Sequence, residues 1–279
     1  MARISKLHTK EKLTLLEKYL QGYVTATKGA MERYYIDALA GDGQCEIEIP
    51  GTSQTQIVDG SPLIAIKLKP GFTKCFFIEI KKKNIKTLTR LVKDFKQNRY
   101  KIREGDCNLV IDEILSEIPQ EAPCFAFLDP EGFEVGWSTI EKIAIHKKGR
   151  KIELFILFPY NMAFARVLYY NKKRFDKENI ALLLNKTLPY NSWIDVYEDR
   201  IKGRLTPLDV RKRILKIFTD GLKRLGYKFV DWKLIESREG RPLYYLIFTT
   251  DHSAGAKIMK HVLQKDWIHG QISFFDKLN

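Results

Sequence analysis

The sequence has no apolar run near the roughly 18 residues that a membrane span needs, so we expect no membrane-spanning helix. Its first residues lead directly into an amphipathic stretch rich in Lys and Glu, without the apolar core of a secretory signal. We therefore expect a cytoplasmic protein. The chain also lacks a Ser-His-Asp order, an HExxH motif and a P-loop, which disfavours the enzyme classes built on those motifs.

Cysteine is scarce, with 4 residues in 279, and the four are scattered along the chain. They form no CxxC pair and have no paired histidines nearby, which excludes a zinc site of the usual spacing, and we predict no metal. Three of them touch apolar runs, where a cysteine behaves as a small buried hydrophobe. The four positions are Cys45, Cys75, Cys107 and Cys124.

Acidic residues are outnumbered by basic ones, 34 to 48, which gives a formal charge of +14 and a pI of about 9.4. Between Arg166 and Lys228 there are 16 Lys or Arg and 7 Asp or Glu, so this segment carries +9 of the +14. From Lys81 to Lys101, nine basic residues stand against one acid. The balance favours a polyanionic partner such as nucleic acid, although charge runs on helices are more often solvated faces.

Near-continuous apolar strands alternate with helices, a pattern that predicts a mostly parallel sheet covered on both faces. We expect residues 44–59 to be irregular. Gly60-Ser61-Pro62 predicts a helix start with Ser61 as the N-cap. The expected strands are 34–36, 75–80, 101–104, 124–128 and 153–158, and the expected helices are 6–31, 82–98, 110–118 and 137–146.

The last third of the sequence changes character. Residues 163–225 predict a helical, basic insertion, and residues 229–237 and 243–250 predict two strands joined as a hairpin, with a final helix over 256–264. There is no internal repeat and no Pro/Gly/Ser linker. We therefore predict one domain over 1–279, an α/β Rossmann-like fold with an antiparallel C-terminal hairpin strand.

Polar groups stand at the carboxyl ends of the expected strands, where an open parallel sheet binds its ligands. Alone, a glycine loop is usually a tight turn and an acid at a strand end is usually a helix cap. Taken together and in order along the chain, these groups describe a nucleoside-cofactor site. They are Asp37 with Gly41 and Gly43, then Glu79, Asp106 and Asp129.

Each of these groups has a physical role in such a site. Gly41 and Gly43 permit a turn with positive φ and a close approach of the backbone to a ligand. Glu79 can accept both hydrogen bonds of a ribose diol, and Asp106 can accept one from an adenine amino group. Asp129 can present a carboxylate to the donor groups of a substrate.

A dinucleotide cofactor is the weaker interpretation of the glycine loop. The dinucleotide fingerprint needs a glycine turn that opens directly into a helix, so that the helix N-terminus meets the pyrophosphate. Here the helix start is delayed to Gly60 or Ser61, and the third glycine is missing. This favours S-adenosylmethionine, which has no pyrophosphate.

The order of these motifs resembles that of class I S-adenosylmethionine-dependent methyltransferases. Over nearly the whole chain the sequence also resembles the three-Cys-motif partner protein family, called TcmP, in residues 35–43, 60–63, 76–79, 127–132 and 244–252. The resemblance implies a methyltransferase-like fold and an iron–sulfur or radical-type partner protein that carries the three cysteines. The cofactor-binding positions predicted with it are Asp37, Leu39, Gly41, Gly43, Glu79, Asp106 and Cys107.

The loop after the fourth strand resembles the Asp-Pro-Pro-aromatic motif of amino-methyltransferases only at its start, in Asp129 and Pro130. Glu131 and Gly132 replace the second proline and the aromatic residue, and Phe133 follows one position late. We predict catalysis by Asp129, Pro130 and Phe133 on a nucleic-acid or nucleotide-like acceptor. A non-catalytic module that binds nucleic acid or a partner protein remains the alternative.

Overall fold

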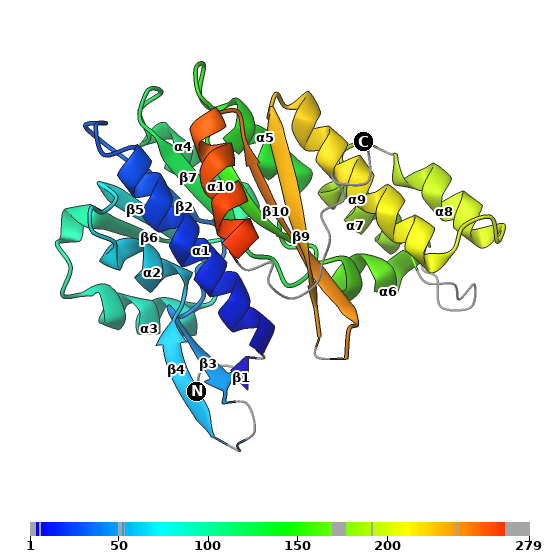
Figure 1. Ribbon diagram of the computed structural model, residues 1–279, viewed down its shortest axis with the longest axis horizontal. Helices are drawn as coiled ribbons and strands as arrows, with labels where there is room; N and C mark the ends of the chain where they lie inside the picture. Colours follow the sequence, from blue (N-terminus) through cyan, green and yellow to red (C-terminus); the bar gives the residue numbers. More distant parts are fainter. Residues whose placement is uncertain are drawn as a thin grey trace.

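A central sheet of seven strands runs through the protein in the order β6-β5-β2-β7-β8-β10-β9 (Figure 1). The computed structural model describes residues 4–5, 7–49, 52, 54–168, 177–190, 192–237 and 239–265. Neighbouring strands are parallel from β6 to β8, whereas β10 is antiparallel to both β8 and β9. The strands are β2 (Tyr34–Asp37), β5 (Lys74–Glu79), β6 (Tyr100–Glu104), β7 (Cys124–Leu128), β8 (Glu153–Phe158), β9 (Phe229–Glu236) and β10 (Pro242–Thr250).

Helices cover both faces of this sheet, and each face has its own apolar core. One face carries α1 (Leu7–Ala26), α2 (Ser61–Lys67), α3 (Lys82–Val92) and α10 (Ser253–Lys265). The other carries α4 (Cys107–Ser116), α5 (Trp137–Ile145), α6 (Ala165–Leu168), α7 (Lys177–Thr187), α8 (Trp193–Ile201) and α9 (Pro207–Arg224). The short helices η1 (Gln97–Arg99) and η2 (Tyr160–Phe164) follow α3 and β8. The predicted Rossmann-like α/β fold is therefore confirmed.

The central strands form where the sequence is apolar at every position, because both of their faces are covered. Every residue of β2, β7 and β8 is buried, from one end of each strand to the other. The two strands of the C-terminal hairpin pair over nearly their whole length, from Pro242 opposite Glu236 to Thr250 opposite Phe229. The predicted antiparallel hairpin strand is thus confirmed, and β10 lies inside the sheet.

The expectation that residues 44–59 are irregular is wrong. They form the antiparallel hairpin of β3 (Gln44–Glu48) and β4 (Thr55–Asp59), and β1 (Ile4–Ser5) pairs with β3 to complete a second, three-stranded sheet. The hairpin projects below the central sheet in Figure 1. Its strand residues are exposed or half-buried, except for Ile47, which is buried. Cys45 and Val58 pack against the core only in part, so the hairpin gives little periodic signal in the sequence.

Several element ends also differ from expectation. Helix α1 ends at Ala26 rather than Met31, and α3 ends at Val92 rather than Asn98. The N-cap of α2 is Gly60, and Ser61 is already helical. The Ser61 side chain makes no cap hydrogen bond, and it opposes the rise in the pKa of the nearby Asp37 carboxyl. Within the described ranges, no helix is long and apolar enough to cross a membrane.

Candidate functional site

The carboxyl edge of the parallel strands gathers the predicted site residues in a line. Asp106 follows β6, Glu79 ends β5, Gly41 and Gly43 follow β2, and Asp129 follows β7. Since β6, β5, β2 and β7 are direct neighbours, these groups stand side by side in this order. Gly105, which donates its N–H to the Glu79 carbonyl at 3.0 Å, joins the first two positions.

The glycine loop is shaped by close contacts on one side and is open on the other. Gly41 has φ +66° and Gly43 has φ +89°, both in the left-handed region that favours glycine. A Cβ on Gly43 would lie 2.9 Å from Leu88 Cδ1, and one on Gly60 would lie 2.9 Å from the Gly43 carbonyl carbon. A Cβ on Gly41 would meet nothing within 4 Å. Gly43 and Gly60 are therefore needed for packing, and Gly41 leaves free space at the edge of the sheet.

Asp37 lies beneath this loop and is completely buried. The Tyr35 hydroxyl donates to its Oδ2 at 3.1 Å, whereas its Oδ1 has no hydrogen-bond partner. Burial raises the pKa of the Asp37 carboxyl to about 7, although the neighbouring Ser61, Tyr35 and Leu39 backbone oppose the rise. The Leu39 side chain packs against the apolar core on the face of the sheet covered by α4 to α9. A buried acid with an unused acceptor atom is costly, and it is typical of sites that bind a cation or a donor group.

Glu79 is only 8% exposed, and its carboxylate is fixed from two sides. The backbone N–H of Lys81 donates to Oε1 at 2.7 Å, and the Asn84 side chain donates to Oε2 at 3.1 Å. Each carboxylate oxygen has a second lone pair, so both can still accept a hydrogen bond from a ligand. The carboxylate is thus held in one orientation at the middle of the line.

Asp106 has a structural role as well as its predicted one. It is the N-cap of α4, and its Oδ1 accepts from the backbone and side-chain N–H groups of Asn108 at 2.9 and 2.6 Å. Asn108 in turn donates to the Glu134 carbonyl and accepts from Gly136 and Thr139, so it ties α4 to the start of α5.

Cys107, beside Asp106, is buried, and burial raises the pKa of its thiol to about 12. It therefore stays a neutral, apolar neighbour of the site. The other cysteines are unpaired thiols, with Cys75 and Cys124 buried and Cys45 half-buried.

Asp129 is paired with a residue that the sequence analysis did not select. Lys12 of α1 donates from Nζ to Asp129 Oδ2. The Lys12 side chain is 10% exposed and that of Asp129 is 22% exposed, so the ammonium lies beneath the carboxylate. The negative charge of Asp129 also contributes to raising the pKa of the Tyr244 hydroxyl and the Cys45 thiol, after burial in both cases. Elements far apart in sequence thus surround this carboxylate.

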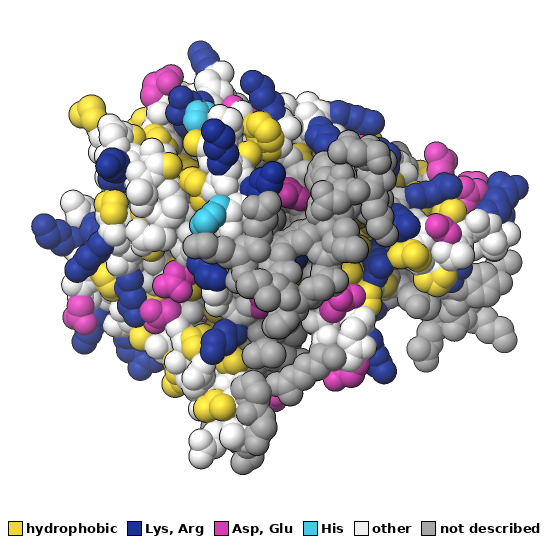
Figure 2. All heavy atoms as spheres, viewed as in Figure 1, with side chains coloured by type: hydrophobic (Ala, Val, Ile, Leu, Met, Phe, Trp, Pro, Cys, Tyr) yellow, Lys and Arg dark blue, Asp and Glu magenta, His cyan; other side chains and the backbone are white. Residues whose placement is uncertain are grey.

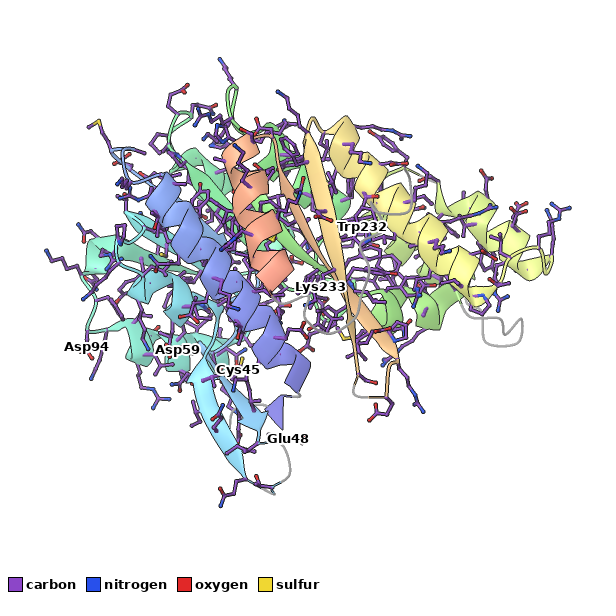
Figure 3. The ribbon with its side chains drawn as sticks, viewed as in Figure 1. Cys45, Glu48, Asp59, Asp94, Trp232 and Lys233 are labelled. Atoms are coloured by element: carbon purple, nitrogen blue, oxygen red, sulfur yellow. The ribbon has the colours of Figure 1, made fainter. Side chains whose placement is uncertain are left out.

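The start of α1 is held against the sheet on a second side. Lys233 of β9 lies beside α1 in Figure 3, and its Nζ is 2.7 Å from Glu11 Oε1. Cys45, labelled in the same view, lies on β3 close to the first turns of α1. The ion pairs of Glu11 and Lys12 therefore fix the N-terminal helix across the carboxyl edge.

The remaining predicted catalytic residues are packed into the fold. Pro130 is buried, and Phe133 is half-buried with its ring edge-on to Phe164 at 5.0 Å between centroids and 74° between planes. A ring held in this way has one side committed to the core. Stacking of Phe133 on a base stays a prediction.

Four polar residues of the site were missed from the sequence: Lys12, Tyr35, Ser61 and Asn108. For Lys12 a signal existed. It stands four residues before Leu16 and seven before Tyr19, both completely buried, so it occupies the apolar stripe of α1. A lysine in such a stripe is rarely buried without a partner, which indicates an acidic residue in the structure opposite it.

No protein-family model matches the sequence, and no curated protein matches it. Among solved structures, a protein of Legionella pneumophila, LPL1258, is similar at 11% identity and a TM-score of 0.49, over 90% of each chain. An O-methyltransferase from Bacillus cereus in complex with SAH is similar at 12% identity and a TM-score of 0.44, over 84% of this chain and 80% of that one.

EvdMO1 is similar at 9% identity and a TM-score of 0.42, over 86% of this chain, and the chain spans 42% of its length. All three similarities have TM-scores below 0.5, and they add no argument about function. The assignment of the fold rests on the strand order, in which an antiparallel β10 lies between β8 and β9 at one end of an otherwise parallel sheet.

Proposed function

We propose that this protein binds S-adenosylmethionine along the carboxyl edge of β6, β5, β2 and β7 and transfers a methyl group to a nucleic-acid or nucleotide-like acceptor. The observation that carries the proposal is the order of Asp106, Glu79, the glycine loop and Asp129 on adjacent strands. Neighbouring strands are about 4.8 Å apart, so four positions cover about 14 Å. That span suits adenine, ribose and a methionine group in a row, with the acceptor at the far end.

The residues present fit this cofactor. Asp37 supplies an unused acceptor atom below the glycine loop, which complements a ligand that carries an ammonium group. Gly41 leaves room above the loop. Glu79 would hold the ribose diol, and Asp106 would accept from the adenine amino group beside the buried Cys107.

The cofactor, when bound, supplies a methyl group on a positively charged sulfur. The contribution of the chain is then alignment of the acceptor, because displacement at carbon depends on the geometry of the attacking atom. Asp129, held from beneath by Lys12, accepts a hydrogen bond from an N–H or O–H of the acceptor and orients it. The basic helices between β8 and β9 would bind the polyanion.

The loop after β7 also favours a second candidate function. Lys12 occupies one oxygen of Asp129, and the ring of Phe133 is packed against Phe164. These two contacts are what we expect in a chain that has kept the fold and lost catalytic activity. It would then be a Rossmann-like binding module for nucleic acid or for the three-Cys-motif partner protein that the TcmP resemblance implies.

Calorimetry with S-adenosylmethionine tests the cofactor claim. Glu79→Ala removes two charged hydrogen-bond acceptors, so we expect a roughly 10- to 150-fold lower affinity. Gly41→Ala should weaken binding because its Cβ enters the open face. Gly203→Ala is the matched control, since Gly203 has φ +71°, also meets nothing within 4 Å and lies outside the site. Unchanged affinity in both Glu79→Ala and Gly41→Ala would contradict the proposal.

Transfer of a tritiated methyl group to bulk RNA and DNA separates the two candidate functions. The enzyme predicts incorporation into one of the two pools that is lost in Asp129→Ala. Cofactor binding without incorporation into either pool would favour the binding module.

A further inference from the structure

Tyr190, in the turn between α7 and α8, has an unusual backbone. Its φ of +57° makes it the one non-glycine residue with positive φ in the described part of the chain. For a bulky L-residue this conformation costs about 1–2 kcal/mol. Its ring is nevertheless 60% exposed, so little apolar burial offsets that cost.

The described residues on both sides of Tyr190 make contacts with the rest of the fold. Pro189 packs on Gly221 of α9, where a Cβ would lie 2.7 Å from Pro189 Cγ and 2.6 Å from Trp137 Cη2. The Ser192 hydroxyl donates to the Pro189 carbonyl at 2.7 Å. The Trp193 indole N–H donates to the Asn185 side chain at 2.7 Å. Tyr190 therefore directly follows a residue that is packed against α9.

A cation accompanies the exposed ring. The Arg224 guanidinium carbon lies 5.9 Å from the centroid of the Tyr190 ring, and Arg224 is itself exposed. Helix α9 carries six Lys or Arg against two acids. On the face drawn in Figure 2, however, basic, acidic and apolar side chains are mixed over the helices at the right. Charge alone does not define a binding surface here, whereas the ring with its guanidinium does.

Helix α7, which leads into this turn, contacts the loop after β7. Lys186, four residues before Tyr190, donates from Nζ to the Glu134 carbonyl at 3.2 Å. Glu134 belongs to the loop between β7 and α5 that also carries Asp129 and Phe133. Four residues span at most about 14 Å, which limits the distance between the Cα atoms of Lys186 and Tyr190.

We propose that Tyr190 and Arg224 form a stacking platform for an unpaired base, so that the nucleic acid bound by this protein is single-stranded. The inference rests on the proposed nucleic-acid acceptor and specifies its class. An exposed ring with an adjacent guanidinium binds the face of any unpaired base and its phosphate, whereas the bases of a duplex are stacked inside and unavailable. The cation–π contact alone contributes only about 0.5–1 kcal/mol at an exposed site and does not offset the backbone cost.

Fluorescence anisotropy with the full chain tests the platform, using a labelled 20-nucleotide RNA, the same sequence as DNA, and their duplexes. We expect tighter binding of the single strands. Tyr190→Asn removes the ring but suits the left-handed backbone, so it should keep wild-type thermal stability and lower single-strand affinity by roughly 5- to 100-fold. Tyr190→Phe keeps the ring and should stay within about twofold.

Two further variants complete the experiment. Arg224→Gln should weaken binding and flatten its dependence on salt, because one phosphate contact is lost. Leu182→Ala removes another exposed apolar side chain of the same helical region and should have no effect. Equal affinity of Tyr190→Asn and wild type, or a preference for duplex, would overturn the platform.

Titration of S-adenosylmethionine into Tyr190→Asn distinguishes the platform from the proposed cofactor site. Wild-type cofactor affinity is expected, because Tyr190 does not line that site. A chain that binds cofactor but no oligonucleotide overturns the platform alone. A chain whose oligonucleotide binding depends on Tyr190 but that binds no cofactor overturns the methyltransferase proposal and leaves the platform standing.

Discussion

Lys12 and Asp129 form an ion pair that joins the N-terminal helix to the loop after β7. Removing one partner of a buried pair is expensive because it leaves the other charge uncompensated. The cost here is reduced, since Asp129 retains 22% exposure to solvent. The pair therefore couples the position of α1 to the orientation of the predicted acceptor-binding carboxylate.

Lys12→Met is expected to lower the free energy of unfolding by about 1–3 kcal/mol. The exposed lysine two residues earlier provides the control, and Lys10→Met should stay within about 0.5 kcal/mol of wild type. Urea unfolding of both variants measures the difference. Adding Asp129→Asn to Lys12→Met should recover part of the loss, and a double variant that is no more stable than Lys12→Met would argue against charge as the cause.

At the scale of elements, α9 approaches the rest of the helical layer closely at Gly221. The absence of a side chain there lets Trp137 and Pro189 pack against the helix backbone. Alanine is the better helix former by up to about 1 kcal/mol, so propensity and packing oppose each other at this position.

We expect the packing cost of an added side chain to exceed the gain in helix propensity. Gly221→Ala is expected to destabilise the protein by about 1–3 kcal/mol, because the contacts at 2.6 and 2.7 Å involve a tryptophan ring and a proline that cannot easily move. Lys216→Ala in the same helix removes only an exposed side chain and should change stability by less than about 0.5 kcal/mol. Thermal unfolding compares the two, and a Gly221→Ala protein as stable as wild type would refute the close approach.

The same elements show what the sequence could and could not predict. Strands β7 and β8 have the predicted residues, because an unbroken apolar run has few alternatives to a buried strand. The β3–β4 hairpin was missed because its strands are polar and held by a neighbour distant in sequence. The local sequence predicts Ser61 as a helix cap, whereas the cap is Gly60 and Ser61 acts on the pKa of Asp37, a tertiary effect that no local pattern encodes.

At the scale of the whole molecule, two buried acids lie at opposite ends of the parallel strands of the sheet. Asp37 ends β2, and Glu153 begins β8, where Tyr19 and Thr250 donate to its carboxylate. Burial raises the pKa of each to about 7. Between about pH 4 and pH 7 the unfolded chain has lost these protons and the folded chain retains them, so stability should fall as pH rises through this window.

Each acid contributes at most about 4 kcal/mol to this fall, given its ordinary pKa near 4. Asp37→Asn and Glu153→Gln should each lessen the pH dependence, and together they should nearly abolish the part that lies between pH 4 and pH 7. Urea unfolding at pH 5 and pH 8 measures it. Equal pH dependence in the double variant and wild type would show that neither group is protonated in the folded protein.

The place of β10 has a consequence for synthesis of the chain. The strand pairs on both sides, with β8 and β9, yet it is the last of the seven to be made. All four positions along the carboxyl edge have been translated by residue 129. Once β8 has been made by residue 158, it has an open edge on which another nascent chain can pair. Only the arrival of residue 250 closes it. A chain that stalls before then would carry all four positions along the carboxyl edge, and the open edge of β8 would still favour aggregation.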